Sequence, residues 1–373
     1  MRIPAATLVA LALSSVLVAA VDPPVPPLSA AQAAPSASGI GQPSGPFTLA
    51  VLRKDGTVIP FAHFDGRKWS NSWVVPTKAF EVPLSLDDVP DKWWPQRKPI
   101  TSWTAWPTQR SSRRIETRGP VLLRAHCQRT VGLRTNWVPN EIPPPDGVQP
   151  YPKEGVATAG GSVLVEPVQL IADSMPEWKM VAERVSEEVT AREQAAVRNL
   201  GAVWKHPVPE TQRTKTPFEP EVVLRSHDRA SGLDVYYFEG VKRYAARPPR
   251  GPEWLERGDY LVGRGPGGTT LAGPPGSGQA PRAQARGCEI LSFASGWLMM
   301  SAGRTRSLKL SVDITDCNRE GLVYTLPLGA IRLNGRLVWI IQVSGYGYER
   351  YEIVEIQNAE LKILLAVPGG ACG

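Results

Sequence analysis

A group of aspartates and tryptophans forms the stretch of this chain that most resembles a site for chemistry. Its members are Asp87, Asp88, Asp91, Trp93, Trp94, Trp103 and Trp106. An indole face can stack on a sugar, and a glycosidase needs two carboxyl groups placed about 5 to 10 Å apart. Large aromatic side chains also fill the cores of small β structures, which is their commoner role. The pattern therefore suggests glycan binding at the four tryptophans, with a glycan hydrolase that uses paired carboxylates as the alternative.

A second group of carboxylates lies near the C-terminus, at Glu349, Glu352 and Glu355. Spacing along the chain does not determine the distance between side chains across a sheet. A catalytic carboxylate pair is therefore a hypothesis for either group.

The sequence lacks the other motifs that would indicate catalysis or cofactor binding. It has four histidines, at His63, His126, His206 and His227. None forms the H-x-x-x-H or H-x-H spacing of a metal site, and the glycines from Gly263 to Gly268 lack the lysine of a phosphate-binding loop. No G-x-S-x-G nucleophile elbow occurs. We therefore predict no metal and no cofactor, and whether the protein is an enzyme stays open.

Four cysteines are present, at Cys127, Cys288, Cys317 and Cys372, and none belongs to a C-x-x-C motif. In an exported protein, such cysteines form disulfides that persist in an oxidising compartment. Four cysteines allow three pairings, and their spacing alone does not choose among them. We expect strands at Glu289–Phe293, Trp297–Met300 and Leu308–Ile314 between Cys288 and Cys317. If these strands are antiparallel neighbours, the two cysteines can meet at one sheet edge. We therefore predict a Cys288–Cys317 bridge, which leaves Cys127 to pair with Cys372.

The N-terminus has the layout of a secretory signal peptide. Arg2 precedes an apolar run from Leu8 to Val21, and Ala31-Gln32-Ala33 forms a small-residue cleavage motif. The apolar run is shorter than the roughly 20 residues that span a bilayer, and no similar run follows. We expect a signal peptide at residues 1–33, a disordered linker at 34–46, and a secreted or periplasmic protein with no transmembrane segment after the leader.

The formal net charge is +7, and arginines gather between Gln109 and Thr135. They are Arg110, Arg113, Arg114, Arg118, Arg124, Arg129 and Arg134. A basic stripe can attract an anionic polymer, although a solvated strand face is the commoner explanation. For an exported protein the polymer would be an acidic glycan or lipid. The partner is thus unknown, a cell-envelope polymer is a candidate, and no nucleic acid is expected.

The clearest structural signal is Asn334-Gly335, a pair that tolerates the positive φ angles of a tight hairpin turn. It predicts that Leu333 faces Arg336 and that Ile331 faces Val338. Apolar side chains then fall on both faces of the two strands, so both faces must be covered. Three further strand-like segments extend the prediction to a meander of four or five strands. They are Leu308–Ile314, Tyr351–Ile356 and Leu361–Val367.

Similar patterns predict other elements along the chain. Two pairs of strand-like segments are typical of hairpins. They are Phe47–Leu52 with Thr57–Phe64, and Val222–Leu224 with Leu233–Tyr244. The pattern of residues 174–200 predicts one helix, which begins with a capping box at Ser174 and Glu177. Its apolar side chains form a narrow stripe, so the helix is expected to pack through a single face. The Gly/Pro-rich segment 248–287 has the composition of a disordered loop.

These elements predict a mainly-β fold over residues 47–372 with one peripheral helix. A β-propeller-like arrangement suits strands that are apolar on both faces, because neighbouring blades cover both sides. The alternative is a pair of β-sandwich or barrel domains that meet near the connector from Pro139 to Pro152. With an export signal and no catalytic motif, we expect a binding or scaffold protein that recognises glycans or another cell-envelope component.

Overall fold

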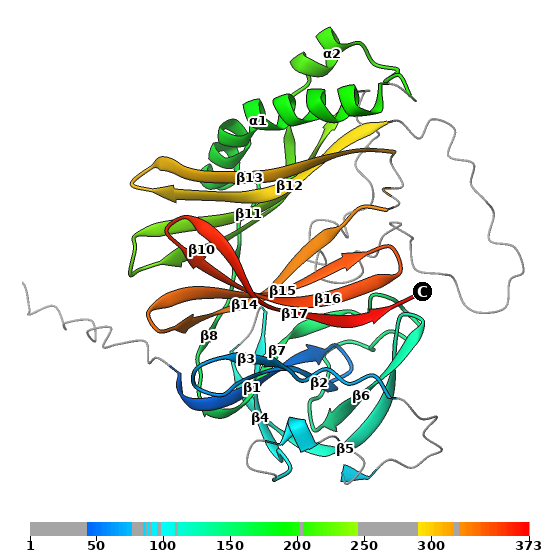
Figure 1. Ribbon diagram of the computed structural model, residues 1–373, viewed down its shortest axis with the longest axis vertical. Coiled ribbons are helices and arrows are strands. Elements are labelled where there is room, and N and C mark those ends of the chain that lie inside the picture. The colour runs from blue at the N-terminus through cyan, green and yellow to red at the C-terminus, as the bar shows by residue number, and fades with distance from the viewer. Residues whose placement is uncertain are drawn as a thin grey trace, which may run out of the picture. The chain divides into compact units, whose positions relative to one another are not determined.

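The computed structural model describes residues 43–76, 85–86, 89, 91–94, 98–108, 111–201, 204–244, 290–316, 319 and 321–372 (Figure 1). The predicted signal peptide and the predicted loop at 248–287 lie outside these residues. The first strand begins at Ser44, inside the segment predicted to be a linker.

The first seven strands form one antiparallel sheet that closes into a barrel. Its order is β1-β7-β4-β5-β6-β2-β3, and β1 also pairs with β2, so that six strands form a ring and β3 extends from β2. The strands are β1 (Ser44–Arg53), β2 (Val58–Phe64), β3 (Trp69–Asn71), β4 (Ser102–Pro107), β5 (Arg113–Ala125), β6 (Gln128–Thr135) and β7 (Lys153–Ser162). The β1–β2 pair is the predicted N-terminal hairpin, with Leu52 opposite Val58.

The interior of the barrel holds alanines, branched aliphatic side chains and tryptophans. One buried cluster draws on all six strands of the ring, including Ala50, Ala105 and Ala157. A narrow ring leaves little interior space, so alanines at these positions leave room for the larger side chains. Trp103 of β4 belongs to this cluster, and the short 3-10 helix η2 (Asp91–Trp93) adds Trp93.

The C-terminal strands form most of a five-stranded sheet, which we call the inner sheet, with the order β17-β16-β15-β14-β8. Its strands are β8 (Val165–Glu166), β14 (Tyr324–Leu333), β15 (Arg336–Gly345), β16 (Tyr348–Gln357) and β17 (Glu360–Ala371). The predicted Asn334-Gly335 turn is confirmed, with φ angles of 53° and 77°. Leu333 faces Arg336, as the sequence predicts.

A second five-stranded sheet, the outer sheet, has the order β13-β12-β11-β10-β9. Its strands are β9 (Gln169–Leu170), β10 (Glu219–Asp228), β11 (Leu233–Arg243), β12 (Leu291–Ser301) and β13 (Arg304–Thr315). The predicted hairpin from Val222 to Tyr244 is the β10–β11 pair.

Two predictions about this region are wrong. The sequence predicts Glu289–Phe293 and Trp297–Met300 as separate strands, but β12 continues without interruption from Leu291 to Ser301. Gly296 lies inside this strand because β13 approaches it closely. A Cβ at this position would lie 2.3 Å from the Lys309 carbonyl oxygen, so only glycine fits. Leu308–Ile314 lies in the outer sheet and not in the C-terminal meander, because the chain changes sheet between β13 and β14.

The inner sheet is covered on both faces, as its two-sided apolar pattern predicts. Val338 and Ile340 of β15 pack in a cluster with barrel residues such as Phe61, while Trp339 and Ile341 pack against the outer sheet. The alternation of side chains along a strand produces this division. Barrel, inner sheet and outer sheet are therefore successive layers that share buried cores.

The described residues do not show the predicted propeller. Stacked layers, and not radial blades, cover the two-sided strands. The alternative of two β-sandwich or barrel domains is closer to the structure, because the first sheet is a closed barrel and the other two sheets pack face to face. However, the connector from Pro139 to Pro152 joins two barrel strands, and the chain leaves the barrel only after β7.

Residues 163–171, which we call the crossing segment, link all the layers. They follow β7 of the barrel, add β8 to the inner sheet and β9 to the outer sheet, and precede the first helix. The crossing segment thus forms two short strands in different sheets and not one continuous strand.

Helix α1 (Pro176–Leu200) packs on the face of the outer sheet that points away from the inner sheet (Figure 1). Val181, Val185 and Val189 are fully buried, and each contributes about 1.5–3 kcal/mol by leaving water. The predicted capping box does not form: the N-cap is Met175, with no side-chain cap. Glu177 instead contacts Arg225 at 3.4 Å. A short second helix, α2 (Glu210–Lys215), has no counterpart in the sequence prediction.

Candidate functional site

A cavity of about 280 Å³ lies where the barrel, the inner sheet and the outer sheet meet. Residues 150–153, which lead into β7, form one side, and the part of the crossing segment from 167 to 170 forms another. The outer sheet contributes Val222, Leu224 and Glu239, and the inner sheet contributes residues 324–327 with Gln342 and Ser344. The cavity thus depends on segments from all three sheets.

Most of this lining is apolar. Leu224 and Leu326 contribute aliphatic side chains, and Pro152, Pro167 and Pro327 also lie in the wall. Proline has no backbone N–H, so these positions add surface without a hydrogen-bond donor. A ligand in contact with this wall must be largely apolar.

Gln342 and Ser344 form a polar end in this apolar cavity. Gln342 is 3% exposed, and its Nε2 donates to Ser344 Oγ at 2.8 Å and to Glu349 Oε2 at 3.3 Å. Within the described part of the chain, the buried Gln342 Oε1 has no hydrogen-bond partner. A buried polar oxygen without a partner is costly.

A buried ion pair supports the polar end. Lys153 Nζ lies 3.3 Å from both carboxylate oxygens of Glu349 and donates to the Tyr151 carbonyl at 2.5 Å. Burial lowers the pKa of Lys153, and the adjacent Glu349 carboxylate opposes that shift. The Tyr351 hydroxyl donates to Glu349 Oε1 at 2.6 Å. Burial raises the pKa of Tyr351 well above its ordinary value, so it serves as a neutral donor.

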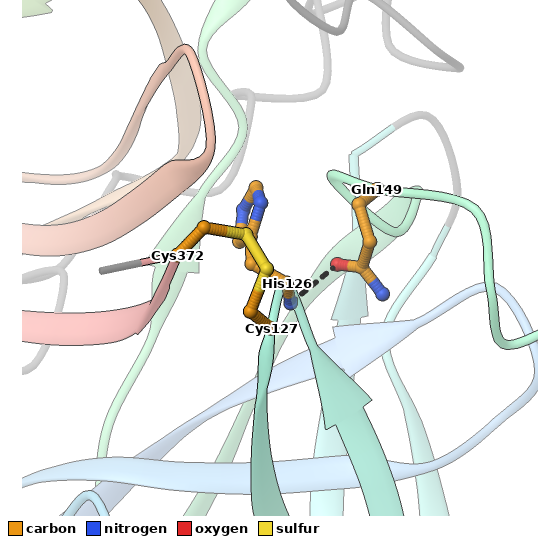
Figure 2. Close-up of a disulfide and its surroundings, with 4 residues drawn as sticks. All are labelled: His126, Cys127, Gln149 and Cys372. Atoms are coloured by element: carbon orange, nitrogen blue, oxygen red, sulfur yellow. Dashed lines mark hydrogen bonds between the residues drawn. A yellow bond between two sulfur atoms is a disulfide. The ribbon is translucent and has the colours of Figure 1, made fainter.

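The Cys127–Cys372 disulfide lies close to this network. It joins the turn of the β5–β6 hairpin to the residue after β17, and its Cα atoms are 4.7 Å apart. Figure 2 shows the bridge beside His126, whose backbone N–H donates to Gln149 Oε1 at 3.1 Å. His126 Nε2 lies 3.9 Å from Glu349 Oε2. The predicted pairing of Cys127 with Cys372 is therefore present, and it holds the C-terminal strand against the barrel.

Glycines allow β17 to pass directly over Glu349. A Cβ at Gly369 would lie 2.9 Å from Glu349 Cγ, and one at Gly370 would lie 2.6 Å from the Ala125 carbonyl. Close approach of the chain therefore requires glycine at both positions. The C-terminal strand covers the ion pair from this side.

Glu239 of β11 brings a carboxylate to the cavity wall. Its Oε1 accepts hydrogen bonds from the Tyr237 hydroxyl at 2.7 Å and from the Thr325 backbone N–H at 3.3 Å. The second bond links the outer sheet to β14 of the inner sheet.

The four tryptophans predicted to bind glycans do not converge on one surface. Trp93, Trp94 and Trp103 are 0%, 7% and 1% exposed and pack in the barrel interior. Trp106 packs against the cluster between barrel and inner sheet, and its Nε1 donates to Thr158 Oγ1 at 3.0 Å. Trp103 and Trp106 are three positions apart on one strand, so they point to opposite faces. None of the four lines the cavity.

The C-terminal carboxylates do not form a pair either. Glu349 and Glu355 lie on the same face of β16 but six residues apart, which separates them by roughly 20 Å along the strand. Glu352 lies on the other face, opposite Ile341. Asp91 is exposed in η2.

The clustered arginines are divided between two faces of the β5 strand. Arg114 points outward, because its neighbour Ile115 packs in the barrel interior. A β-bulge between Thr117 and Gly119 shifts the alternation, so Arg124 lies on the interior side at the end of the barrel. It faces Arg129 across the hairpin. All three arginines are exposed, but they do not make one continuous stripe.

Several residues to which the sequence analysis gave a candidate role lie outside the described part of the chain. They are Asp87, Asp88, Arg110, Cys288 and Cys317. The Cys288–Cys317 bridge therefore stays a prediction. Among the described residues, no cluster of His, Cys, Asp or Glu could hold a metal ion, and no helix is long and apolar enough to cross a membrane.

Sequence reasoning missed most residues at the polar end of the cavity. It considered Glu349 only as a possible catalytic carboxylate, and it assigned no role to Lys153 or Gln342. One signal was available: Gln342 and Ser344 interrupt the apolar run of a strand predicted to be covered on both faces. A polar amide in such a strand requires a buried hydrogen-bond partner.

The structure thus defines a mainly-β protein in which a six-stranded barrel packs on a pair of five-stranded sheets. Comparisons with protein-family models, with curated proteins and with solved structures found no match to this chain.

Proposed function

We propose that this protein is an exported binding protein that takes a small ligand in the cavity between its three sheets. The observation that carries the proposal is the cavity itself, whose mostly apolar wall also includes the polar side chains of Gln342 and Ser344. Small-molecule sites are typically concave and mostly apolar, with a few converging polar groups. The cavity volume of about 280 Å³ lies near the lower end of the usual range, which suits a small ligand.

The arrangement of charges supports binding more than catalysis. Lys153 and Glu349 pair with each other, and Tyr351 donates to the same carboxylate. A nucleophile or general base must instead reach the reacting atom of a bound substrate. We therefore assign the ion pair to holding the cavity wall.

Export is part of the proposal. It is supported by the signal-peptide pattern of residues 1–33 and by the Cys127–Cys372 disulfide, a bond typical of oxidising compartments. A ligand from the cell envelope, including a sugar, fits this location. Expression with the native leader tests it: cleavage after Ala33 is expected, and an uncleaved cytoplasmic product would contradict export.

Ligand binding can be tested by filling the cavity. Toluene, benzyl alcohol and methyl glucoside serve as probes, and amide chemical shifts of Thr325 and Gln342 report binding. Leu326→Trp should abolish the shifts caused by a probe, because the larger ring occupies the cavity. Val323→Trp is the matched control, since Val323 is 41% exposed and does not line the cavity. If no probe shifts these amides in the parent protein, the proposed function is wrong.

A further inference from the structure

We infer that this protein forms a two-fold symmetric dimer, in which β13 pairs antiparallel with β13 of a second copy around Ser311. The two outer sheets then join into one continuous sheet. Because β13 does not line the cavity, the inference is independent of the proposed function.

The edge of β13 is the structural basis of this inference. In the described part of the chain, β13 pairs only with β12. Its backbone makes no hydrogen bond there to another strand or loop. An edge of this kind is a template for an added strand. The edge strands β3, β8 and β9 have only two or three residues each, and the register of β17 is interrupted twice.

A β-bulge limits the regular part of this edge. Met300 pairs with Thr305 and Met299 pairs with Ser307, so Arg306 is an extra residue. From residue 307 to residue 315 the pairing with β12 is regular. Because a bulge bends and twists its strand, residues 307–315 are the part that can accept a straight partner. The midpoint of this segment is Ser311.

Symmetry restricts the register of two identical strands. Opposite residues in an antiparallel pair are of the same kind, since both are hydrogen-bonded or both are not. The two-fold axis must therefore lie at one residue, which faces its own copy. With Ser311 on the axis, the whole regular segment is paired. Ser307 then lies opposite Thr315 of the second copy, Leu308 opposite Ile314, Lys309 opposite Asp313, and Leu310 opposite Val312.

The charges of β13 favour the same register. Only an axis at Ser311 places Lys309 opposite Asp313, and symmetry makes this pair twice. Asp313 is exposed and forms no ion pair within the described residues. Lys309 contacts Glu360 of β17, but such an exposed pair contributes little, so Lys309 can turn to Asp313. A lysine on an edge strand usually prevents pairing, whereas here an opposite charge faces it.

The other face of β13 is apolar. Leu308, Leu310 and Val312 are half-buried and pack against the cluster beneath α1. In the dimer each of them lies opposite an apolar residue of the second copy. Cross-strand apolar pairs stabilise a sheet, so the dimer covers apolar surface that a single copy leaves partly exposed.

Sedimentation of the full chain over a range of concentrations tests the dimer, which should appear as a doubling of mass. Lys309→Asp and Asp313→Lys each place like charges opposite one another at two positions. Each should weaken the dimer about tenfold. Glu360→Gln is the matched control, because it removes the contact of Lys309 within the chain and keeps both interface charges. It should leave the dimer intact.

An equal mixture of the two weakened variants should associate again. One strand then carries two acidic side chains at positions 309 and 313, and the other carries two basic ones. Each charge therefore meets its opposite only in the mixed dimer.

Ser311→Cys tests the register. The Cβ atoms of opposite residues lie about 4.5–5.5 Å apart, so mild oxidation should join two copies through this position. Ser307→Cys is the matched control, because position 307 faces Thr315 and lies roughly 25 Å along the strands from its own copy. The parent protein shows any cross-linking by the native cysteines.

A parent protein that stays monomeric at every concentration overturns the inference. So does a dimer that neither charge variant weakens, because its interface then lies elsewhere. Failure of the mixed variants to associate overturns the Lys309–Asp313 pairing. Cross-linking through Ser307→Cys and not through Ser311→Cys overturns the register.

Discussion

Lys153 and Glu349 form a buried ion pair between β7 of the barrel and β16 of the inner sheet, although 196 residues separate them in the chain. Their side chains are 2% and 5% exposed. The pair therefore connects two sheets at the polar end of the cavity. Because each charge is buried, removal of one partner should have a larger effect than removal of both.

Glu349→Leu is expected to lower the free energy of unfolding by about 3–5 kcal/mol, because it leaves the Lys153 ammonium buried without a counter-charge. The double variant Lys153→Met with Glu349→Leu should recover a large part of this loss. Urea unfolding of the parent, both single variants and the double variant gives the coupling energy. Additive effects of the two substitutions would contradict a direct interaction.

Loss of the Cys127–Cys372 bridge should destabilise the protein strongly, because the bridge links residues 245 positions apart. In the chain-entropy model, closure of so long a loop contributes about 5 kcal/mol, and measured effects are often smaller. Cys127→Ser and Cys372→Ser should have similar unfolding free energies, since each removes the same bond. Non-reducing peptide mapping should show the 127–372 peptide. A peptide that joins Cys127 to Cys288 would contradict the pairing.

The Asn334-Gly335 turn predicts a specific cost for a side chain at Gly335, whose φ is 77°. Gly335→Ala should lower the free energy of unfolding by about 1 kcal/mol, because an L-residue is strained in this region. Gly147→Ala is the matched control, since a Cβ there meets nothing within 4 Å and its φ is not left-handed. Equal denaturation midpoints for the two variants would show that the turn tolerates a side chain.

Asp228 should make the protein sensitive to acid. Burial opposes ionisation of Asp228, but hydrogen bonds from Ser231 at 2.5 Å and from Arg332 at 2.7 Å outweigh it, so its pKa lies below the usual value. A carboxyl group with a lowered pKa stabilises the folded state above its unfolded pKa of about 3.9. That contribution disappears as the pH falls through the folded pKa.

Asp228→Asn should therefore cost about 1–3 kcal/mol at pH 7, and the difference from the parent should shrink toward zero as the pH falls through the lowered pKa of Asp228. Urea unfolding between pH 7 and pH 2 measures this change. Asp173→Asn is the control, because Asp173 is exposed. A cost that does not change with pH would show that the charge of Asp228 is unimportant.

Local signals in the sequence determined the elements that depend on neighbouring residues. The Asn334-Gly335 pair predicted a turn and its register, because positive φ angles depend on residue type. The spacing of Val181, Val185 and Val189 predicted the buried stripe of α1, because helical periodicity places them on one face. The two-sided apolar pattern of β15 also predicted that both of its faces are covered.

Only the tertiary structure decided what covers those faces and where a site forms. Alternation along a strand shows that Trp339 and Ile340 point in opposite directions, but it does not distinguish a propeller blade from a layer in a stack. Likewise, the tryptophans near Asp91 pack in cores because β4 and η2 place them there. The cavity depends on contacts such as Lys153 with Glu349, between segments far apart in the chain. No local pattern encodes such a contact, because it exists only when separate sheets pack against each other.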